Sequence, residues 1–271
     1  MYYCWLNGEI MPASEARLGI TDLGLLRGYG IFDYFRTYNG IPFQWDSYWQ
    51  RFENSAHKMG IDIPISKKES YEHVLTLLQK SEQEDIAIRF VLTGGYSADA
   101  LNSAAANFII IAEEIHPVSD SEYINGIKII TAEYVRDVPD IKTLDYKYLL
   151  SHRPEILARG ASDVLFVKDG IISEMSRSNV FMVKDGKLIT PEHNILHGIT
   201  RKTLLELVKG MYEVEIRDIT LEQFLSADEL FTTSSTKKVL GITAIDDVKI
   251  GDGKSGKVTL ELLSLFNKTL Q

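Results

Sequence analysis

The chain has 271 residues, a length at which one hydrophobic core usually gives way to two, so we expect two domains. Hydrophobic residues make up 45% and charged residues 25% of the chain, a balance that excludes intrinsic disorder and a collagen-like repeat. The formal net charge of -9 repels a phosphate backbone, which excludes nucleic acid as an expected partner.

Neither a membrane nor an oxidising compartment is indicated by the sequence. No apolar run approaches membrane-spanning length, and residues 1–9 lack the basic and apolar segments of a signal peptide. The single cysteine, Cys4, cannot form an internal disulfide, which favours a reducing compartment. We therefore expect a cytoplasmic protein that binds no membrane. The dispersed histidines show no metal-ligand spacing, so no metal is expected.

Residues 1–114 predict an antiparallel sheet covered by helices. Asn-Gly pairs between strand-like runs are typical of hairpin turns. Asp46 is predicted as the N-cap of the first helix and Gly60 as its end, because an aspartate accepts from the first N–H groups and glycine adopts the left-handed conformation. The expected turns are at 7–8 and 39–40, the helices over 46–60 and 66–80, and the later strands over 86–95 and 107–114.

A polar stretch at 115–121, without periodicity, is predicted to link this first domain, residues 1–114, to a second domain, residues 122–271. The second domain again combines β-branched runs with leucines at helical spacing. We therefore expect an α/β (α+β) fold in which each domain is a β-sheet or small β-barrel packed with helices. The expected strands cover 127–135, 163–170, 179–186, 187–191 and 228–235, and the expected helices cover 145–160, 200–212 and 257–270.

Two charged residues stand in places that suit chemistry. Lys142 follows an irregular loop and precedes a predicted helix, where an amine can point into a cleft, although most lysines are solvated. Glu174 stands among strand-like residues, an unusual place for an unpaired charge. The alternative for Glu174 is an edge-strand glutamate that faces water.

Two further segments suit an anion. Residues 197–200, His-Gly-Ile-Thr, open a helix, and a helix start presents unpaired N–H groups that favour a phosphate. Thr200 is equally suited to be only an N-cap. Residues 232–236, Thr-Thr-Ser-Ser-Thr, end a strand with consecutive hydroxyls, which suit either a phosphate or an ordinary turn.

These segments, taken together and in order, resemble the signature blocks of the class IV aminotransferases. The blocks are IKTLDY, SEMSRSNVF, ILHGITR and DELFTTSST, and the earlier DLGLLRGYGIFDYFRTYNG and WDSYWQRFENSA extend the resemblance over nearly the whole chain. The family contains branched-chain aminotransferases, D-amino acid aminotransferases and aminodeoxychorismate lyases. The resemblance implies a fold type IV enzyme that depends on pyridoxal 5'-phosphate (PLP), and a homodimer whose active sites borrow residues across the interface.

The resemblance also implies roles for single residues. Lys142 would form the Schiff base with the cofactor, and its amine would serve first as nucleophile and then as base. Glu174 would pair with the pyridinium nitrogen, which makes the ring an electron sink. The remaining contacts implied are Arg51, Ile199, Thr200, Ser235 and Thr236 on the phosphate, Leu196 on one face of the ring and Tyr146 on its phenolic oxygen.

The predicted reaction moves the amino group of a small amino acid, D-amino acids favoured, to a 2-keto acid such as 2-oxoglutarate or pyruvate. Branched-chain members carry a tyrosine where Arg27 stands, and D-amino acid enzymes carry one where Phe32 stands. The latter also place an arginine in the loop that here, at 93–102, has none. We expect Arg27, reaching in from the partner subunit, and Arg89 to bind the substrate carboxylate, because forked donors match its oxygens.

Several alternatives stay open from the sequence. Arg89 can instead pair with a structural acid while Arg27 is solvated. Two arginines also suit the side-chain carboxylate of L-glutamate bound in the opposite orientation, although they would serve an apolar pocket for leucine or valine poorly. A branched-chain L-amino acid aminotransferase is the alternative function, and an aminodeoxychorismate lyase would share the cofactor site. A non-catalytic binding or scaffold protein would lack the cofactor and be colourless. The presence of Lys142, Glu174 and Arg51 together argues against that class.

Overall fold

The computed structural model describes residues 2–103 and 105–270. The chain forms two compact units, one from Met1–His116 with Ile141–Asp145 and the other from Pro117–Asp140 with Tyr146–Gln271. The first boundary lies inside the segment 115–121, which the sequence predicts as a linker. Nothing in the local sequence pattern indicates that Ile141–Asp145 belongs to the first unit.

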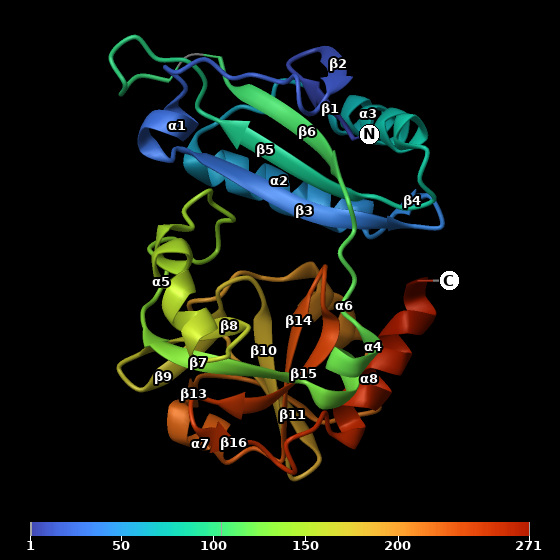
Figure 1. The fold of residues 1–271 in the computed structure, drawn as a ribbon, viewed down its shortest axis with the longest axis vertical. Helices are drawn as coiled ribbons and strands as arrows, with labels where there is room; N and C mark the ends of the chain where they lie inside the picture. Colours follow the sequence, from blue (N-terminus) through green and yellow to red (C-terminus); the bar gives the residue numbers. More distant parts are fainter. Residues whose placement is uncertain (1, 104, 271) are drawn as a thin grey trace. The chain divides into compact units, whose positions relative to one another are not determined.

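A sheet of six antiparallel strands forms the first unit (Figure 1). Its strands are β1 (Tyr3–Leu6), β2 (Glu9–Pro12), β3 (Gly30–Tyr38), β4 (Ile41–Pro42), β5 (Ala87–Thr93) and β6 (Asn107–Glu113). They pair in the order β2-β1-β6-β5-β3-β4. Asn7 and Asn39, at φ 48° and 51°, make with the following glycines the turns that the sequence predicts.

The two faces of this sheet differ in burial because side chains alternate along each strand. Helices α2 (Trp45–Met59) and α3 (Lys67–Ser81) cover one face, where Phe35, Phe90 and Phe108 are completely buried. Their rings contact one another at centroid distances of 5.3 to 5.5 Å. Tyr34 and Arg89 alternate with these residues and therefore point to the opposite, half-buried face.

The helix ends of the first unit follow capping chemistry, with one correction. The N-cap of α2 is Gln44, so the prediction of Asp46 is wrong; Asp46 lies in the first turn, where a negative charge favours the helix dipole. Gly60 ends α2 at φ 65°, as predicted. Ser66 caps α3 in a capping box with Glu69. A short helix that is not predicted, α1 (Leu23–Arg27), follows the N-cap Asp22.

The second unit contains one curled sheet of ten strands (Figure 1). The strands are β7 (Ile127–Glu133), β8 (Asp163–Lys168), β9 (Ile171–Met175), β10 (Asn179–Lys184), β11 (Lys187–Thr190), β12 (Val214–Ile216), β13 (Ile219–Thr220), β14 (Glu229–Ser234), β15 (Lys238–Ile245) and β16 (Val248–Lys249). The order is β12-β11-β10-β14-β15-β7-β8-β9-β13, and β16 pairs with β15. Three of the pairs are parallel: β15 with β7, β7 with β8, and β11 with β12. The predicted mixed α/β class is confirmed.

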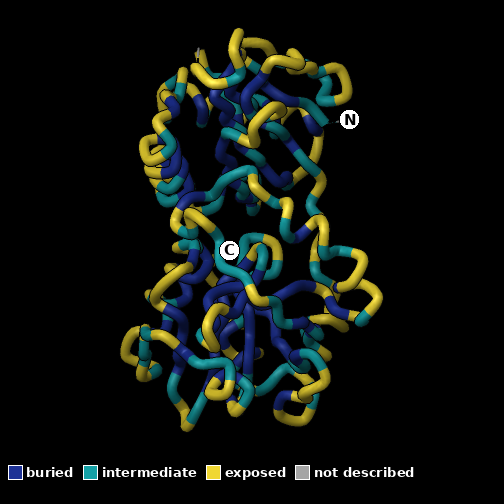
Figure 2. The backbone as a smooth tube through the Cα atoms, turned by 90° about the vertical axis from the view of Figure 1, so that its left-hand side faces the viewer, coloured by how far each residue is buried: buried dark blue, intermediate teal, exposed yellow. Residues whose placement is uncertain are grey.

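Most buried residues of the second unit lie on its longer strands, whereas β12 and β16 contain none. Figure 2 shows the buried segments in the interior of the unit and the exposed ones in the loops at its surface. Its helices are α4 (Asp120–Asn125), α5 (Lys147–Ala158), α6 (Ile199–Leu207), α7 (Leu221–Leu225) and α8 (Lys257–Asn267), followed by a 3-10 turn at Lys268–Leu270. None of the helices in the described part of the chain combines the length and apolarity that a membrane crossing needs.

Several features of this unit differ from the sequence prediction, and helix α7 and the short strands β12, β13 and β16 are among the elements that are not predicted. The end of segment 115–121 is not irregular, because Ser119 caps α4 and accepts a hydrogen bond from the Glu122 N–H. Strand β15 is not predicted. It contains Gly241, which lies close to Ser255. A Cβ atom at Gly241 would lie 2.3 Å from Ser255 Oγ and 3.0 Å from Ser255 Cβ, so any larger residue would require Ser255 to shift.

Candidate functional site

Lys142 is held on the first unit by backbone hydrogen bonds to β3. The Phe32 N–H donates to the Lys142 carbonyl at 2.9 Å, and the Leu144 N–H donates to the Gly30 carbonyl at 3.1 Å. These bonds fix the backbone of an otherwise irregular segment beside a strand. The Lys142 Nζ atom lies 4.6 Å from the centroid of the Phe32 ring.

Arg89, on β5, lies near the same aromatic ring. Its Cζ atom is 5.6 Å from the Phe32 centroid and 5.0 Å from the Tyr34 centroid. Within the first unit the structure thus brings two of the predicted site residues, Lys142 and Arg89, to one side chain. In the sequence, Phe32 is notable only as a departure from the family pattern. Its contacts with Lys142 and Arg89 were not predicted.

The Arg89 guanidinium also forms a bidentate ion pair with Glu113. Nε lies 2.5 Å from Oε1 and Nη2 lies 2.9 Å from Oε2, and about a third of each side chain is exposed. This is the contact with an acid that the sequence leaves open as an alternative. Burial, followed by the charge of Glu113, raises the pKa of the neighbouring Tyr34. A carboxylate ligand at Arg89 would share the guanidinium with Glu113 or displace it.

Arg51 and Arg27 lie elsewhere in the first unit. Arg51, on α2, pairs with the buried Asp33 of β3, with Nε 2.9 Å from Oδ2 and Nη2 2.5 Å from Oδ1. It therefore holds the helix to the sheet, whatever else it binds. Arg27 ends α1 and is exposed, and its Nε donates to the Ala100 carbonyl at 3.2 Å.

In the second unit, Glu174 on β9 is only 4% exposed, so the alternative of a glutamate facing water is wrong. Its Oε1 accepts hydrogen bonds from Nε and Nη2 of Arg136 at 2.9 and 2.6 Å. Its Oε2 accepts from the Leu196 N–H at 2.9 Å. These donors hold the carboxylate in one orientation.

Arg136 is a site residue that the sequence analysis missed. A buried carboxylate requires a cationic partner, which is a signal that an arginine should lie close to Glu174. The signal does not say which arginine, because the partner lies 38 residues away in an irregular segment. The Arg136 guanidinium is itself held by the Pro139 carbonyl.

The start of α6 has the features of an anion site. Its N-cap is Gly198, with no side-chain cap, and a Cβ atom there would lie 2.1 Å from Asn179 Oδ1. Thr200, which the sequence leaves open as an N-cap, lies instead in the first turn. Burial lowers the pKa of Arg201 in the same turn, and this arginine donates to two neutral acceptors, the Thr190 hydroxyl and the Pro191 carbonyl. The uncapped N–H groups and this cation make the helix start positive.

The Thr232–Thr236 segment lies beside this helix start. Thr233 is paired with Asn179 across the β10–β14 ladder, so both side chains point to one face, and Asn179 donates to the Leu196 carbonyl at 2.7 Å. Among the described residues, none hydrogen-bonds the buried Thr233 Oγ1. Beyond it, Ser235 is half-buried and Thr236 is exposed. A buried hydroxyl without a partner is costly, and a bound polar group would relieve that cost.

These contacts connect two of the predicted second-unit residues, Glu174 and Leu196, to the strand that leads into the hydroxyl run. Glu174 bonds to Leu196, Leu196 to Asn179, and Asn179 faces Thr233 on the strand that ends in Ser234. Tyr146, at the N-cap of α5, instead packs against a separate apolar cluster that includes Leu149 and Phe166. No group of residues suited to hold a metal ion occurs in the described ranges 2–103 and 105–270.

Comparison with known proteins gives one consistent result. Residues 30–245 match the family model described as amino-transferase class IV. The chain is 30% identical to D-alanine aminotransferase of Bacillus licheniformis, over 97% of this chain and 95% of the relative. It is also 30% identical to a putative branched-chain-amino-acid aminotransferase of Methanocaldococcus jannaschii, over 97% and 94%.

A solved structure of similar fold is a T.th. branched-chain amino acid aminotransferase with pyridoxamine 5'-phosphate. The TM-score is 0.92 at 27% sequence identity, and the match covers 99% of this chain and 94% of that one. The fold similarity therefore extends across the whole length on which the sites above are built.

The Arg136–Glu174 pair yields a stability prediction. Replacing Arg136 with methionine leaves a buried carboxylate without its cation, so the free energy of unfolding should fall on the order of 3 kcal/mol. The free energy of unfolding is measured by urea denaturation. Adding Glu174→Gln to the variant should recover much of the loss. Arg153→Met, which removes a guanidinium that donates to the neutral Ser162 carbonyl, is the control. An equal loss in that control would refute the assignment.

Proposed function

The chain belongs to the class IV aminotransferases, and from this premise we propose that it moves the amino group of a small amino acid to a 2-keto acid such as 2-oxoglutarate or pyruvate, with D-amino acids favoured. The family uses PLP. The observation that carries the proposal is the buried acid Glu174, which accepts a hydrogen bond from the Leu196 N–H just before the start of α6. In the part of the chain that the structure describes, the Thr233 hydroxyl has no hydrogen-bond partner.

The residues of the second unit fit PLP. The N–H groups of Ile199 and Thr200 would hold a dianionic phosphate, because Gly198 supplies no side-chain cap to the helix start. Thr233 offers a buried hydroxyl for which residues 2–103 and 105–270 supply no hydrogen-bond partner. Glu174, whose carboxylate is paired with the Arg136 guanidinium, suits the protonated nitrogen of a pyridine ring. The proposed cofactor contacts are Arg51, Lys142, Tyr146, Glu174, Leu196, Ile199, Thr200, Ser235 and Thr236.

When bound, PLP supplies an aldehyde that takes up the amino group and a ring that accepts electron density. Glu174 holds the proton on the ring nitrogen. Lys142 Nζ acts as the nucleophile and moves the proton at the substrate Cα, so that one amine serves both steps. The backbone bonds between the Lys142 segment and β3 keep the backbone that carries this amine in a fixed place.

Arg89 and Arg27 are proposed to bind the substrate carboxylate. Arg89 lies near the Phe32 ring, as Lys142 Nζ does, which supports a carboxylate held close to the reacting amine. Glu113 competes for the same guanidinium, so substrate binding includes the rearrangement of that ion pair. Arg27 is proposed to act on the partner subunit's site. A branched-chain L-amino acid specificity is the alternative. It is supported by the Methanocaldococcus jannaschii relative, whose sequence identity to this chain, 30%, equals that of the D-alanine aminotransferase.

A homodimer is proposed from the surface around α1, which we call the α1 patch. The α1 patch is formed by the segments 18–26 and 96–101. Hydrogen bonds join the two segments, because the Gly19 N–H donates to Tyr96 Oη and the Ser97 N–H donates to the Thr21 carbonyl. Exposed apolar residues on such a patch favour a protein partner. The patch consists of Leu18, Ile20, Leu25, Leu26, Tyr96 and Leu101. A cytoplasmic location is proposed from the composition alone.

Light scattering tests the dimer. The wild type should have twice the mass of the 30.6 kDa chain, and Leu25→Glu should shift it towards the monomer because a charge would be buried in the interface. Met211→Glu, at an exposed methionine outside the α1 patch, is the matched control. A monomeric wild type would contradict the proposal.

Covalent trapping tests the cofactor. Borohydride reduction of the purified protein followed by peptide mapping should place the pyridoxyl label on Lys142. Lys142→Ala should lose the label and at least about 99% of the activity, since both nucleophile and base are removed. Lys147→Ala, a nearby lysine at the start of α5, should keep both. A label on another lysine, or none, would overturn the proposed function.

A coupled assay tests the substrate. D-alanine, D-glutamate, L-leucine and L-glutamate are compared with 2-oxoglutarate or pyruvate as acceptor, and a D-amino acid should react fastest. Arg89→Ala and Arg27→Ala should each raise KM about tenfold or more, the loss expected for a hydrogen bond to a charged group, without loss of bound cofactor. Arg153→Ala is the control. L-leucine as the best substrate would favour the branched-chain alternative.

A further inference from the structure

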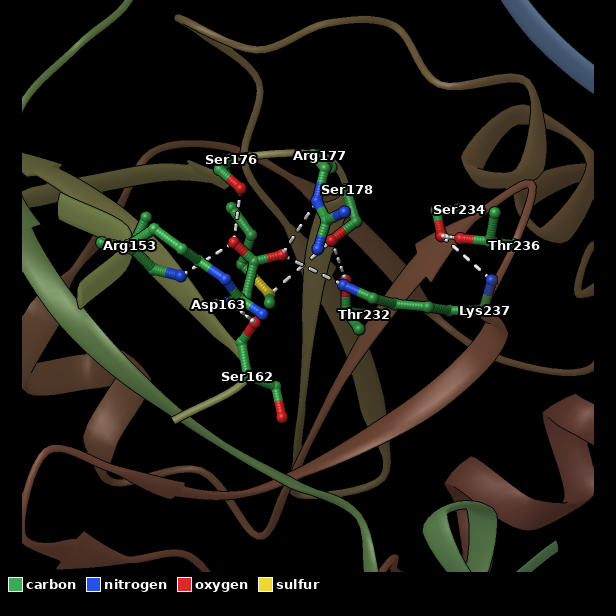
Figure 3. A network of polar contacts seen from close by, with 12 residues as sticks. Arg153, Ser162, Asp163, Ser176, Arg177, Ser178, Thr232, Ser234, Thr236 and Lys237 are labelled. Atoms are coloured by element: carbon green, nitrogen blue, oxygen red, sulfur yellow. Dashed lines mark hydrogen bonds and ion pairs between the residues drawn. The ribbon is translucent and has the colours of Figure 1, made fainter. Parts of the chain in front are cut away.

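Asp163, at the start of β8, carries a carboxylate that is completely buried (Figure 3). Its Oδ2 lies 3.1 Å from Lys237 Nζ and 3.9 Å from Arg177 Nε. Its Oδ1 accepts hydrogen bonds from Ser176 Oγ and, at 2.8 Å, from the Val164 N–H. Neutral and charged donors thus surround a single buried acid.

The acid is charged at neutral pH. Burial by itself raises the pKa of Asp163, but the charges of Lys237 and Arg177 and the two hydrogen bonds outweigh it, so the pKa lies below its ordinary value. Lys237 is therefore bound by a full charge inside the unit, where an ion pair is weakly screened.

Lys237 directly follows the hydroxyl turn Ser234–Thr236, and it is fixed at both ends. Its N–H donates to Ser234 Oγ at 3.1 Å, and its carbonyl accepts from Tyr123 Oη at 3.2 Å. Its side chain, 14% exposed, reaches away from the turn to Asp163, as Figure 3 shows. Within the turn, Ser234 Oγ lies 3.2 Å from Thr236 Oγ1. The conformation of the turn is thus tied to the position of one ammonium group.

Stability alone is a weak reason for this pair. A buried ion pair loses much of its Coulomb energy to desolvation, and apolar side chains of similar volume are often as stable. What an ion pair adds is direction, because its charged atoms fit together in one arrangement. Asp163 also accepts from Ser176, in the turn that follows the Glu174 strand, so the same carboxylate holds both turns.

We propose that the Asp163–Lys237 ion pair positions the Ser234–Thr236 turn for the phosphate of the cofactor. Both are positioning residues: they act through the turn and do not touch the cofactor. The inference rests on the proposed function, in which Ser235 and Thr236 bind that phosphate. It predicts that the pair affects binding of the phosphate and leaves binding of the ring unchanged.

Two ligands separate these effects: PLP, and pyridoxal, which lacks the phosphate. Dissociation constants are measured by absorbance on the purified full chain after removal of bound cofactor. Asp163→Asn and Lys237→Met should each weaken PLP binding about tenfold or more, as expected when a hydrogen bond to a charged group is misplaced, while pyridoxal binding stays within about twofold. Lys237→Arg should restore PLP binding, because it keeps the charge.

Glu133→Gln is the matched control, since it removes an exposed ion pair to Lys168 on the same sheet and should change neither constant. Equal weakening of both ligands would show a merely structural role and overturn the proposal. Unchanged or tighter PLP binding in Lys237→Met or Asp163→Asn would also overturn it. If Asp163→Asn does not fold, Lys237→Met decides alone, because its side chain is the less buried of the two. A wild type that binds neither ligand would instead contradict the proposed function.

Discussion

Both units depend on the constraint that an ionised carboxylate inside a protein must keep its donors. In the first unit Asp33 meets Arg51, which ties α2 to β3. In the second unit Glu174 meets Arg136, and Asp163 meets Lys237. Each pair joins segments that are distant in sequence. Because a lost partner would leave a charge unpaired, each pair admits few alternative arrangements of its backbone, and the residues proposed to bind the cofactor are carried on that backbone.

Features with a local physical cause were predictable from the sequence. Asn39-Gly40 makes its hairpin turn because these residues adopt positive φ at little cost. Gly60 ends α2 for the same reason. The start of α6 after Gly198 and the end of β14 in a hydroxyl run were also predictable, since both follow from short patterns. The family resemblance added the roles of Lys142 and Glu174, which no pattern of burial or charge alone would supply.

Features that depend on distant residues were not predictable. Arg136 and Glu174 are separated by 38 residues, and Lys237 and Asp163 by 74, so no local signal selects those partners among the other charged residues. Helix α1 is too short to be stable by itself. It forms because Asp22 caps it and is itself held by Thr93 Oγ1 and the Asn107 amide. Strand β15 was not predicted because Gly241 weakens its strand pattern. The glycine is accounted for only by its close contact with Ser255, which the local sequence does not indicate.

The division of the chain has a consequence for its architecture. The polypeptide passes from one unit to the other at 116–117, again at 140–141 and once more at 145–146, so neither unit is a continuous piece of sequence. The excursion in the middle is the segment that carries Lys142. A gene fragment that ends at the first passage, 116–117, would encode the strands of the first unit but not Lys142. Neither unit can therefore be obtained as one uninterrupted piece of the chain, since the first unit includes Ile141–Asp145 and the second includes residues on both sides of that segment.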